Sequence, residues 1–347
     1  MKAEPSFRAT LMAIWERLLD RPHIGIEEDF FKLGGDPSVA VGLFSEIKRT
    51  CGRSLPPETI YVAPTIDSLA ALLERPVLPQ FPPLVLLKEG TQQQPVFITH
   101  GLGATISELF HVVNHMRSKN PIYGMQAKGI DGRAEPSRTI EEMAAYFLEA
   151  VKKLQPRGPY CFVGYSLGGL ITFEMARQLS ASGDCVGLLA MLDSYPHMEF
   201  LSSGEKLRLL RRRIRSRLAG TLNPRLRKNI PFTGESIGRE VETARRSAEY
   251  LNDLSGFASI WPPPRYREST QSALARYRPR FYSGKMKFVR AAMPSRFPEN
   301  PAAVWAHLVE RIEIQTVPGD HRGMITVHAE ALGKILSTYL AEEFPEL

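Results

Sequence analysis

The sequence predicts an α/β fold, a mostly parallel sheet covered by helices on both faces, with a small all-helical domain before it. From residue 84 onward, short apolar runs of strand length alternate with segments of helical period, which is typical of βαβ units. One of these runs ends at the glycine-bounded serine turn 164–168, and a helical pattern follows it. Residues 1–75, in contrast, contain only helical patterns. The chain is therefore expected to hold two domains of different class.

Seven apolar runs are predicted as strands of the sheet. They are Leu84–Leu87, Val96–Thr99, Ile122–Gln126, Tyr160–Gly164, Val186–Leu192, Met286–Ala291 and Ile312–Val317. Between them, Ile140–Leu154 and Leu170–Leu179 place apolar residues at helical spacing. The stretch of about 195–282 is long, largely helical in pattern, and interrupts the sheet between two strands. Because insertions at such a point typically cover a functional site, we expect a helical lid there.

Residues 1–75 are predicted to form a compact helical bundle. Two apolar helix faces are made of Phe7, Leu11, Ile14, Trp15 and Leu18, and of Ala40, Leu43, Phe44 and Ile47. A third helix opens at Pro64–Leu73, where the side chain of Thr65 is expected to cap the helix. Four prolines then crowd into residues 76–83, a stretch without helical or strand period. This stretch is predicted to be the linker before the larger domain at 84–347.

Composition excludes several classes of protein. The chain has 347 residues, of which 43% are hydrophobic and 23% charged, as in ordinary globular domains. The start of the chain lacks the features of a signal peptide, and no run approaches the ~18 apolar residues of a transmembrane segment. The three cysteines have no metal-ligand spacing. Their sparse, odd number favours a reducing, cytoplasmic setting without a bound metal, and Cys161 and Cys185 are expected in the core.

The net charge of +7 is concentrated in one segment. Lys206–Lys228 holds ten basic residues and no acidic one, and Leu207, Leu210, Ile214 and Leu218 recur through it at helical spacing. Three interpretations of this amphipathic helix stay open: a solvated face, a docking surface for an acidic protein, or a membrane-surface helix. Nucleic acid is not expected as a partner, because no aromatic-rich or zinc-spaced reader accompanies the basic residues.

Ser166 is predicted to be a nucleophile. It stands in Gly164-Tyr165-Ser166-Leu167-Gly168, directly after an apolar strand and before an apolar helix. A serine hydroxyl is a weak nucleophile and must be exposed at a sharp turn, within reach of a base. The strand, the G-x-S-x-G turn and the helix together form the nucleophile elbow of an α/β-hydrolase.

A histidine and an acid are expected to complete the site. In α/β-hydrolases these residues follow the serine in the order acid, then histidine. His321 follows the last predicted strand in Pro318–His321, at the strand end from which it can reach back to Ser166. Asp193 directly follows the strand Val186–Leu192, whereas no carboxylate follows Met286–Ala291 closely. Asp193 is therefore the predicted acid, and Asp320 is expected to shape the loop of its neighbour.

Two backbone N–H groups are expected to form an oxyanion hole. Leu167, the residue after the nucleophile, is predicted to supply one. The other is assigned to Leu102, with Gly101 as the alternative, because His100–Ala104 follows the early strand Val96–Thr99. His100 itself is expected to be structural.

With these residues in place, residues 84–347 resemble the type I thioesterase domains of nonribosomal peptide and polyketide synthetases. The resemblance is carried by PVFITHGLGA, PYCFVGYSLGG, LLAMLDSYP, ARYRPRFYSGKMKFVRA and VPGDHRGM, and that family also places its acid where Asp193 stands. It implies release of an acyl or peptidyl chain from a carrier-bound thioester through an acyl-Ser166 intermediate. Water or an internal nucleophile would complete the release, giving hydrolysis or cyclisation. The 195–282 insertion would be the lid over the acyl channel.

The first 75 residues resemble a peptidyl carrier domain through Ile14-Trp15, DFFKLGGD and Pro64-Thr65-Ile66. The family places the serine that carries phosphopantetheine after Gly-Gly-Asp, with alanine, leucine and isoleucine three, six and ten residues later. Counting from residue 37 meets Ala40, Leu43 and Ile47, so Pro37 stands at the serine position. Proline suits a first helical position but has no hydroxyl. No cofactor is therefore expected on this domain or in the thioesterase, and Ser38 is the alternative attachment site.

This departure changes the expected partner. A thioesterase fused to a carrier without its serine cannot take substrate from its own arm, and the expected partner is an acyl- or peptidyl-carrier protein of a synthetase. Two interpretations stay open: the thioesterase unloads such a carrier on another chain, or residues 1–75 are only a docking or folding unit. Two other functions stay open. One is a general carboxylesterase, which would prefer oxygen esters. The other is a non-catalytic adaptor that binds synthetase carrier domains.

Overall fold

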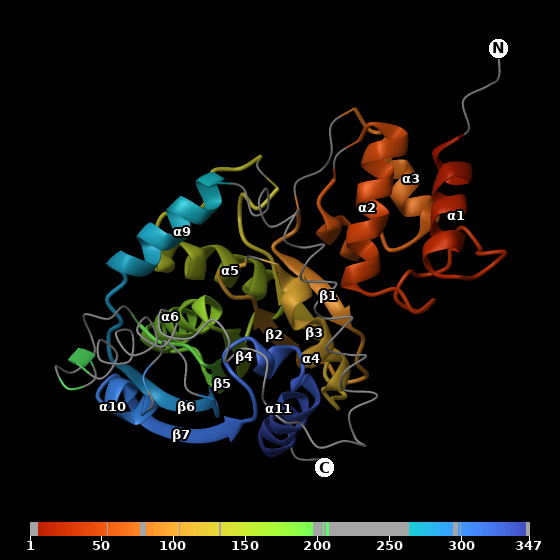
Figure 1. Cartoon of the computed structure of the whole chain (residues 1–347). Coiled ribbons are helices and arrows are strands. Elements are labelled where there is room, and N and C mark those ends of the chain that lie inside the picture. Colours follow the sequence, from red (N-terminus) through yellow and green to blue (C-terminus); the bar gives the residue numbers. More distant parts are fainter. Residues whose placement is uncertain are drawn as a thin grey trace, which may run out of the picture.

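The computed structural model describes residues 6–53, 55–76, 81–103, 105–131, 133–196, 204, 206–207, 264–293, 298 and 300–344 (Figure 1). Within them, a small bundle of helices precedes a sheet that is flanked by helices. The predicted α/β-hydrolase class, with an all-helical domain ahead of it, is confirmed.

The sheet has seven strands in the order β1-β3-β2-β4-β5-β6-β7. Their bounds are Leu84–Lys88 (β1), Val96–Thr99 (β2), Ile122–Met125 (β3), Tyr160–Tyr165 (β4), Val186–Leu192 (β5), Tyr282–Ala291 (β6) and Val309–Val317 (β7). β1 pairs antiparallel with β3, and every other pair is parallel. The carboxyl ends of β2 and of β4 to β7 therefore meet at one edge of the sheet, where sites of open α/β sheets form.

Helices cover both faces of this sheet. On one face lie α5 (Ile140–Leu154), α6 (Leu167–Ala181), α9 (Pro264–Arg276) and α10 (Pro301–Trp305), and on the other α4 (Phe110–His115) and α11 (Ala329–Glu343) (Figure 1). Two short 3-10 helices, η2 (Ile106–Leu109) and η5 (Gly323–Ile325), lie in loops. Each face has its own apolar core, with Phe162 and Phe173 in the first and Val163 and Leu332 in the second. Burial of these two cores fixes the strand ends that position the site.

The N-terminal domain is built from α1 (Phe7–Leu18), α2 (Pro37–Cys51), η1 (Pro57–Tyr61) and α3 (Ile66–Glu74). Its separate apolar core surrounds Trp15, whose ring meets that of Phe30 edge-on at 5.2 Å. Thr65 caps α3 as predicted, since its hydroxyl accepts the backbone N–H of Ser68 at 3.1 Å. The bundle thus has its own core and is a structural unit of its own.

Several sequence predictions are corrected or lie outside the described residues. Cys161 is buried as predicted, but Cys185 is exposed, because it stands one residue before β5 in the loop after α6. The lid proposed for 195–282 and the basic segment Lys206–Lys228 lie mostly outside the described residues. Among the residues that the structure does describe, no helix combines the length and apolarity needed to cross a membrane.

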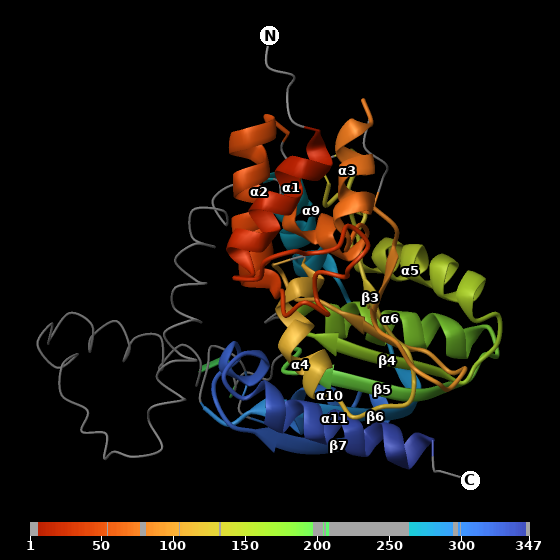
Figure 2. The ribbon, with the colours of Figure 1, turned by 90° about the vertical axis from the view of Figure 1, so that its right-hand side faces the viewer.

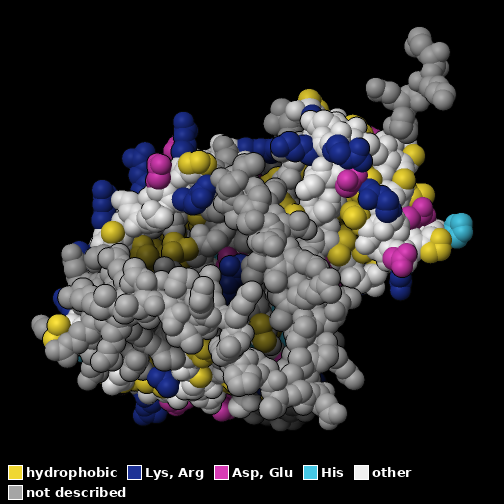
Figure 3. Space-filling model, in the orientation of Figure 1, with side chains coloured by type: hydrophobic (Ala, Val, Ile, Leu, Met, Phe, Trp, Pro, Cys, Tyr) yellow, Lys and Arg dark blue, Asp and Glu magenta, His cyan; other side chains and the backbone are white. Residues whose placement is uncertain are grey.

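Basic side chains gather at the edge of the molecule where α9 lies (Figure 3). On α9 itself, Arg265 and Arg276 are exposed while Tyr266 and Ala273 are buried. Its one apolar face packs on the protein and its other face is charged.

Candidate active site

Ser166 stands at a strained turn between β4 and α6. Its backbone has φ 54° and ψ −116°, a conformation that residues other than glycine rarely adopt. The turn brings strand and helix so close that a Cβ on Gly164 would lie 2.4 Å from the carbonyl oxygen of Gly168. Only glycine fits there, which explains the glycine spacing around the serine. This sharp turn places the Ser166 side chain at the carboxyl edge of the sheet.

The structure brings Ser166, His321 and Asp193 together. His321, in the loop after β7, places Nε2 3.1 Å from Ser166 Oγ. Its Nδ1 lies 2.8 Å from Asp193 Oδ2. Both separations are hydrogen-bond distances, so the three side chains form one hydrogen-bonded chain. The three residues chosen from the sequence therefore converge, although they lie at the ends of three different strands.

Asp193 is held rigidly at the end of β5. Its backbone N–H donates to the carbonyl of Val289 at 2.8 Å, and its Oδ1 accepts the N–H of Ala291 at 3.4 Å. The residue is 3% exposed and has a positive φ of 45°. Since Oδ1 is engaged by β6, Oδ2 remains to face His321.

Tyr165 packs against His321, a contact that no pattern in the sequence predicts. The two rings stack with centroids 4.9 Å apart, and the Tyr165 hydroxyl donates to the carbonyl oxygen of His321 at 2.8 Å. Burial raises the pKa of Tyr165, and the charges of Glu108 and Asp193 add to this rise. Tyr165 is thus a neutral hydrogen-bond donor that joins the nucleophile strand to the histidine loop.

Two N–H groups are candidates for the oxyanion hole. Leu167 is the first residue of α6, a position whose N–H has no partner within the helix. Leu102 is 37% exposed on the loop after β2, whereas the N–H of its neighbour Gly101 donates to Glu108 Oε2 at 3.3 Å. Between the two residues weighed for the second donor, Gly101 is therefore already engaged, which favours Leu102.

Glu108 supports this loop from η2. A Cβ on Gly103 would lie 1.7 Å from Glu108 Oε1, so the carboxyl packs directly against the loop. Burial raises the pKa of Glu108 to about 7; the Gly101 N–H and the charge of Arg322 oppose this rise, and the charge of Glu58 adds to it. Sequence reasoning missed this residue, because nothing local marks a single glutamate in an apolar segment.

Other polar residues near the site have structural roles. His100 is buried and its Nδ1 lies 2.8 Å from the carbonyl oxygen of Gly101. Burial lowers its pKa to about 4, so it is neutral and structural as predicted. Asp320 accepts the N–H groups of Arg322 and Gly323 at 3.2 and 2.7 Å, which confirms that it shapes the loop. Ser194 donates its hydroxyl to the carbonyl oxygen of Ser166 and steadies the turn.

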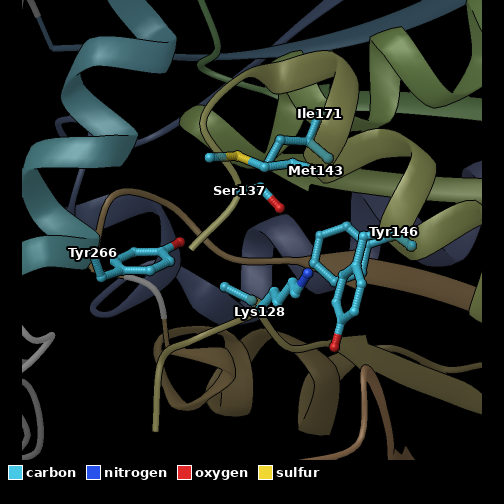
Figure 4. Close-up of a pocket in the computed structure, with 8 residues that line it drawn as sticks. Lys128, Ser137, Met143, Tyr146, Ile171 and Tyr266 are labelled. Carbon is cyan, nitrogen blue, oxygen red and sulfur yellow. The ribbon is translucent and has the colours of Figure 1, made fainter. Parts of the chain in front are cut away.

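A pocket lies beside α6, between this helix, α5 and α9 (Figure 4). Met143, Phe147 and Ile171 give it an apolar wall, and Lys128, Ser137 and Tyr266 line it with polar groups. Figure 4 shows the Tyr266 hydroxyl directed into this space. Ile171 follows Ser166 by five residues, about 7.5 Å along the helix axis. The pocket therefore lies beside the second turn of the helix that begins directly after Ser166.

The carrier-like domain shows how its helix α2 begins. Asp36 is the N-cap, and its carboxylate accepts the N–H groups of Ser38 and Val39 at 2.8 and 3.0 Å. Pro37 is thus the first helical residue, as predicted, and it is buried. Ser38 is exposed, and its hydroxyl donates to Asp36 Oδ1 at 2.5 Å. A proline at the first position offers no hydroxyl for attachment of phosphopantetheine, so residue 37 does not fit that group.

Comparison with known families identifies both domains. Residues 94–341 match the model of the thioesterase domain, and residues 9–73 match the model named phosphopantetheine attachment site. Residues 9–73 contain α2 and Pro37, so the chain has a carrier-type domain before the thioesterase domain.

Curated relatives are synthetases. The chain is 30% identical over 336 residues, 96% of its length, to a dimodular nonribosomal peptide synthase of Bacillus subtilis (strain 168). It is 37% identical over 182 residues, 52% of its length, to an indigoidine synthase of Dickeya dadantii. It spans only 14% and 12% of these relatives.

Solved structures share the fold. A four-domain nonribosomal peptide synthetase, holo-AB3403, matches all of this chain with a TM-score of 0.58 at 22% identity, over 27% of its own length. YbtT, a type II thioesterase from the yersiniabactin pathway, matches over its whole length and 76% of this chain, with a TM-score of 0.51 at 16% identity. The two family models show that the chain belongs to the thioesterase domain family and carries a carrier-type domain ahead of the thioesterase domain.

Proposed function

We propose that this protein is a serine thioesterase that releases an acyl or peptidyl chain from the phosphopantetheine thioester of a carrier protein. The observation that carries the proposal is the hydrogen-bonded chain from Ser166 through His321 to Asp193, with separations of 3.1 and 2.8 Å. Within the thioesterase family, this arrangement supports chemistry through a covalent acyl-serine.

In the proposed reaction, Ser166 Oγ attacks the thioester carbonyl carbon while its proton passes to His321 Nε2. Asp193 accepts the Nδ1–H of His321 and stabilises the imidazolium that forms. The N–H groups of Leu167 and Leu102 would stabilise the oxyanion. The carbon–sulfur bond then breaks, the thiolate takes the proton from His321, and the acyl chain stays on Ser166. Water or a nucleophile within the chain, deprotonated by His321, then attacks the ester carbonyl carbon. The bond to Ser166 Oγ breaks, Oγ takes the proton back from His321, and the product leaves as an acid or a ring.

The pocket beside α6 suits the acyl part of this substrate. Its wall of Met143, Phe147 and Ile171 favours apolar groups, and the Tyr266 hydroxyl offers a polar contact. Tyr266 is almost fully buried, and the side chain of Thr270, one turn further along α9, interacts with its hydroxyl. A polar group of the bound chain would give this hydroxyl a second partner.

The substrate would come from another chain. Since Pro37 has no hydroxyl, the carrier-like domain would hold no phosphopantetheine, and a loaded carrier protein in trans would supply the thioester. Ser38 is the alternative attachment site, and its hydroxyl is already bound to Asp36.

Product analysis by mass spectrometry tests this function. A panel of acyl-pantetheine thioesters is offered to the wild type, to Ser166→Ala and to Ser180→Ala, a control at the exposed far end of α6. We expect release by the wild type and the control, and none by Ser166→Ala. Faster cleavage of matched oxygen esters would instead indicate a carboxylesterase. Absence of any cleavage would indicate an adaptor.

A further inference from the structure

The carrier-like domain contacts the thioesterase domain next to the loop of the proposed oxyanion hole. Both views place the helical bundle beside β1 and α4 (Figures 1 and 2). The Phe31 ring lies 5.6 Å from that of Phe110, the first residue of α4. On η1, Glu58 is close enough to Thr105 that the Thr105 side chain lowers the pKa of its carboxyl, although burial, the larger effect, raises it. Phe110 and Thr105 flank η2, the short helix that follows the loop containing Leu102.

The attachment end of the carrier-like domain faces this same surface. Asp36, the N-cap of α2, is close enough to His111 that its charge raises the pKa of the histidine, although burial, the larger effect, lowers it. Pro37, at the position of the missing serine, is buried. Glu58 and Thr59 on η1 are only 3% and 2% exposed. The domain therefore presents to its neighbour the end from which a carrier would extend its arm.

The contact is made by packed aromatic rings. Phe31 stacks on Tyr61 with centroids 4.9 Å apart and meets Phe30 edge-on at 5.4 Å, so it connects the carrier core to Phe110. Loss of one such aromatic contact weakens association by about fivefold. A domain tethered by a short linker competes at an effective concentration of about millimolar, well above that of most partners in solution. Even a modest contact therefore keeps this surface occupied.

We propose that the carrier-like domain occupies in cis the surface on which a loaded carrier protein of another chain docks, and thereby restricts release from that carrier. This inference rests on the proposed thioesterase function. A domain of the same kind already packs on the surface through Phe31, with the start of α2 near His111, yet Pro37 leaves it without an arm. A loaded carrier must displace it, whereas a small pantetheine thioester need not.

The test compares two substrates that carry the same acyl chain. This chain is the one that the wild type releases fastest from the panel of pantetheine thioesters. One is that pantetheine thioester, and the other is the same acyl group on the phosphopantetheine arm of an excised synthetase carrier domain. Phe31→Ala in the full chain is expected to raise kcat/KM for the carrier-bound thioester about fivefold and to leave the pantetheine thioester unchanged. Phe7→Ala, a partly buried phenylalanine on α1 that packs on the same carrier core, is the matched control and should change neither.

The outcomes separate this inference from the proposed function. An unchanged or lower kcat/KM on the carrier-bound thioester, with the pantetheine thioester still cleaved, would overturn occupancy in cis. If circular dichroism shows that Phe31→Ala loses helix, Phe31→Leu replaces it under the same criteria. If the wild type cleaves neither substrate, the proposed function fails. In that case, calorimetry measures the affinity of the loaded carrier for the wild type and for the Phe31 variant. Tighter binding to the variant supports occupancy of the docking surface in cis, and equal binding overturns it.

Discussion

Tyr165 ties the loop that carries His321 to the strand that carries Ser166. Its ring stacks on the imidazole, and its hydroxyl holds the carbonyl oxygen of the same histidine at 2.8 Å. His321 must keep its Nε2 on Ser166 while its Nδ1 faces Asp193. A small shift of the loop would lengthen both contacts, and transfer of a proton depends strongly on such geometry.

Replacement of this hydroxyl should slow catalysis without weakening substrate binding. We expect Tyr165→Phe to lower kcat about tenfold and to leave KM unchanged. A tenfold loss corresponds to ~1.4 kcal/mol, the contribution of one hydrogen bond. Tyr160→Phe is the matched control, because Tyr160 is on the same strand and its buried hydroxyl has no partner among the described residues. Steady-state kinetics on a pantetheine thioester give the answer. Equal losses in both variants, or an effect on KM alone, would contradict this role of Tyr165.

At the residue scale, the three hydrogen-bonded side chains could be predicted from the sequence, but the residues that hold them in position could not. Ser166, Asp193 and His321 each follow a run that reads as a strand, and parallel strands bring such ends together. The Tyr165–His321 contact joins residues 156 positions apart. No periodicity encodes which side chains of a folded sheet touch one another.

At the scale of elements, the start of α2 decides whether the carrier-like domain carries a cofactor. Asp36 caps the helix with two backbone hydrogen bonds, which fixes Pro37 as its first residue. Proline is favoured at that position because its N–H is not needed and its φ is already helical. The fold is thus compatible with proline where the chemistry of attachment is not.

Restoration of the serine should restore attachment. Incubated with a phosphopantetheinyl transferase and coenzyme A, the wild type is expected to keep its mass, and Pro37→Ser to gain one phosphopantetheine group. The double variant Pro37→Ser with Ser38→Ala should behave as the single one does. Intact-protein mass spectrometry measures all three. A gain by the wild type that Ser38→Ala abolishes would show that Ser38 is the attachment site.

Prediction of elements succeeded where apolar residues are continuous. Val96–Thr99, Val186–Leu192 and Ile140–Leu154 have the predicted bounds because each is buried along most of one or both faces. β6 and β7 begin earlier than predicted, at Tyr282 and Val309. The first residues of β6 alternate between buried and exposed. Those of β7 are mostly exposed, because β7 is the edge strand of the sheet.

At the scale of the whole molecule, two carboxyl groups, one from each domain, lie near enough for their charges to interact. Burial raises the pKa of Glu58 in the carrier-like domain and the pKa of Glu108 in the thioesterase domain, the latter to about 7. Each group is therefore more stable protonated in the folded chain, and their charges repel one another. This pairing of domains follows from shape at the interface, which neither domain's own sequence pattern reveals.

The raised pKa of Glu108 predicts a stability that falls with pH. The ordinary pKa of 4.5 applies to the unfolded chain and about 7 to the folded one, so the folded state binds more protons between these values. The wild type, relative to Glu108→Gln, should therefore lose stability as pH rises from about 4.5 to about 7. The half-buried side chain makes this loss smaller than the ~3 kcal/mol of the full shift.

Urea unfolding of the wild type and Glu108→Gln across this pH range measures the difference. Glu149→Gln is the control, because Glu149 is exposed and its hydrogen bond to Lys153 lowers its pKa instead. Relative to this control variant, the wild type should show no such loss. The raised pKa of Glu108 would be contradicted if the difference in free energy of unfolding between wild type and Glu108→Gln did not change with pH. It would also be contradicted if the wild type became the more stable of the two as pH rises.

The most direct test of the account is detection of the acyl-enzyme. An acyl-pantetheine thioester with a slowly released chain is mixed with the protein, and the intact mass and its peptides are measured within the first turnover. We predict a mass gain equal to the acyl group, located on the peptide that contains Ser166 and absent from Ser166→Ala. Thioester cleavage without this adduct, or an adduct that persists in Ser166→Ala, would contradict the proposal that Ser166 is the nucleophile.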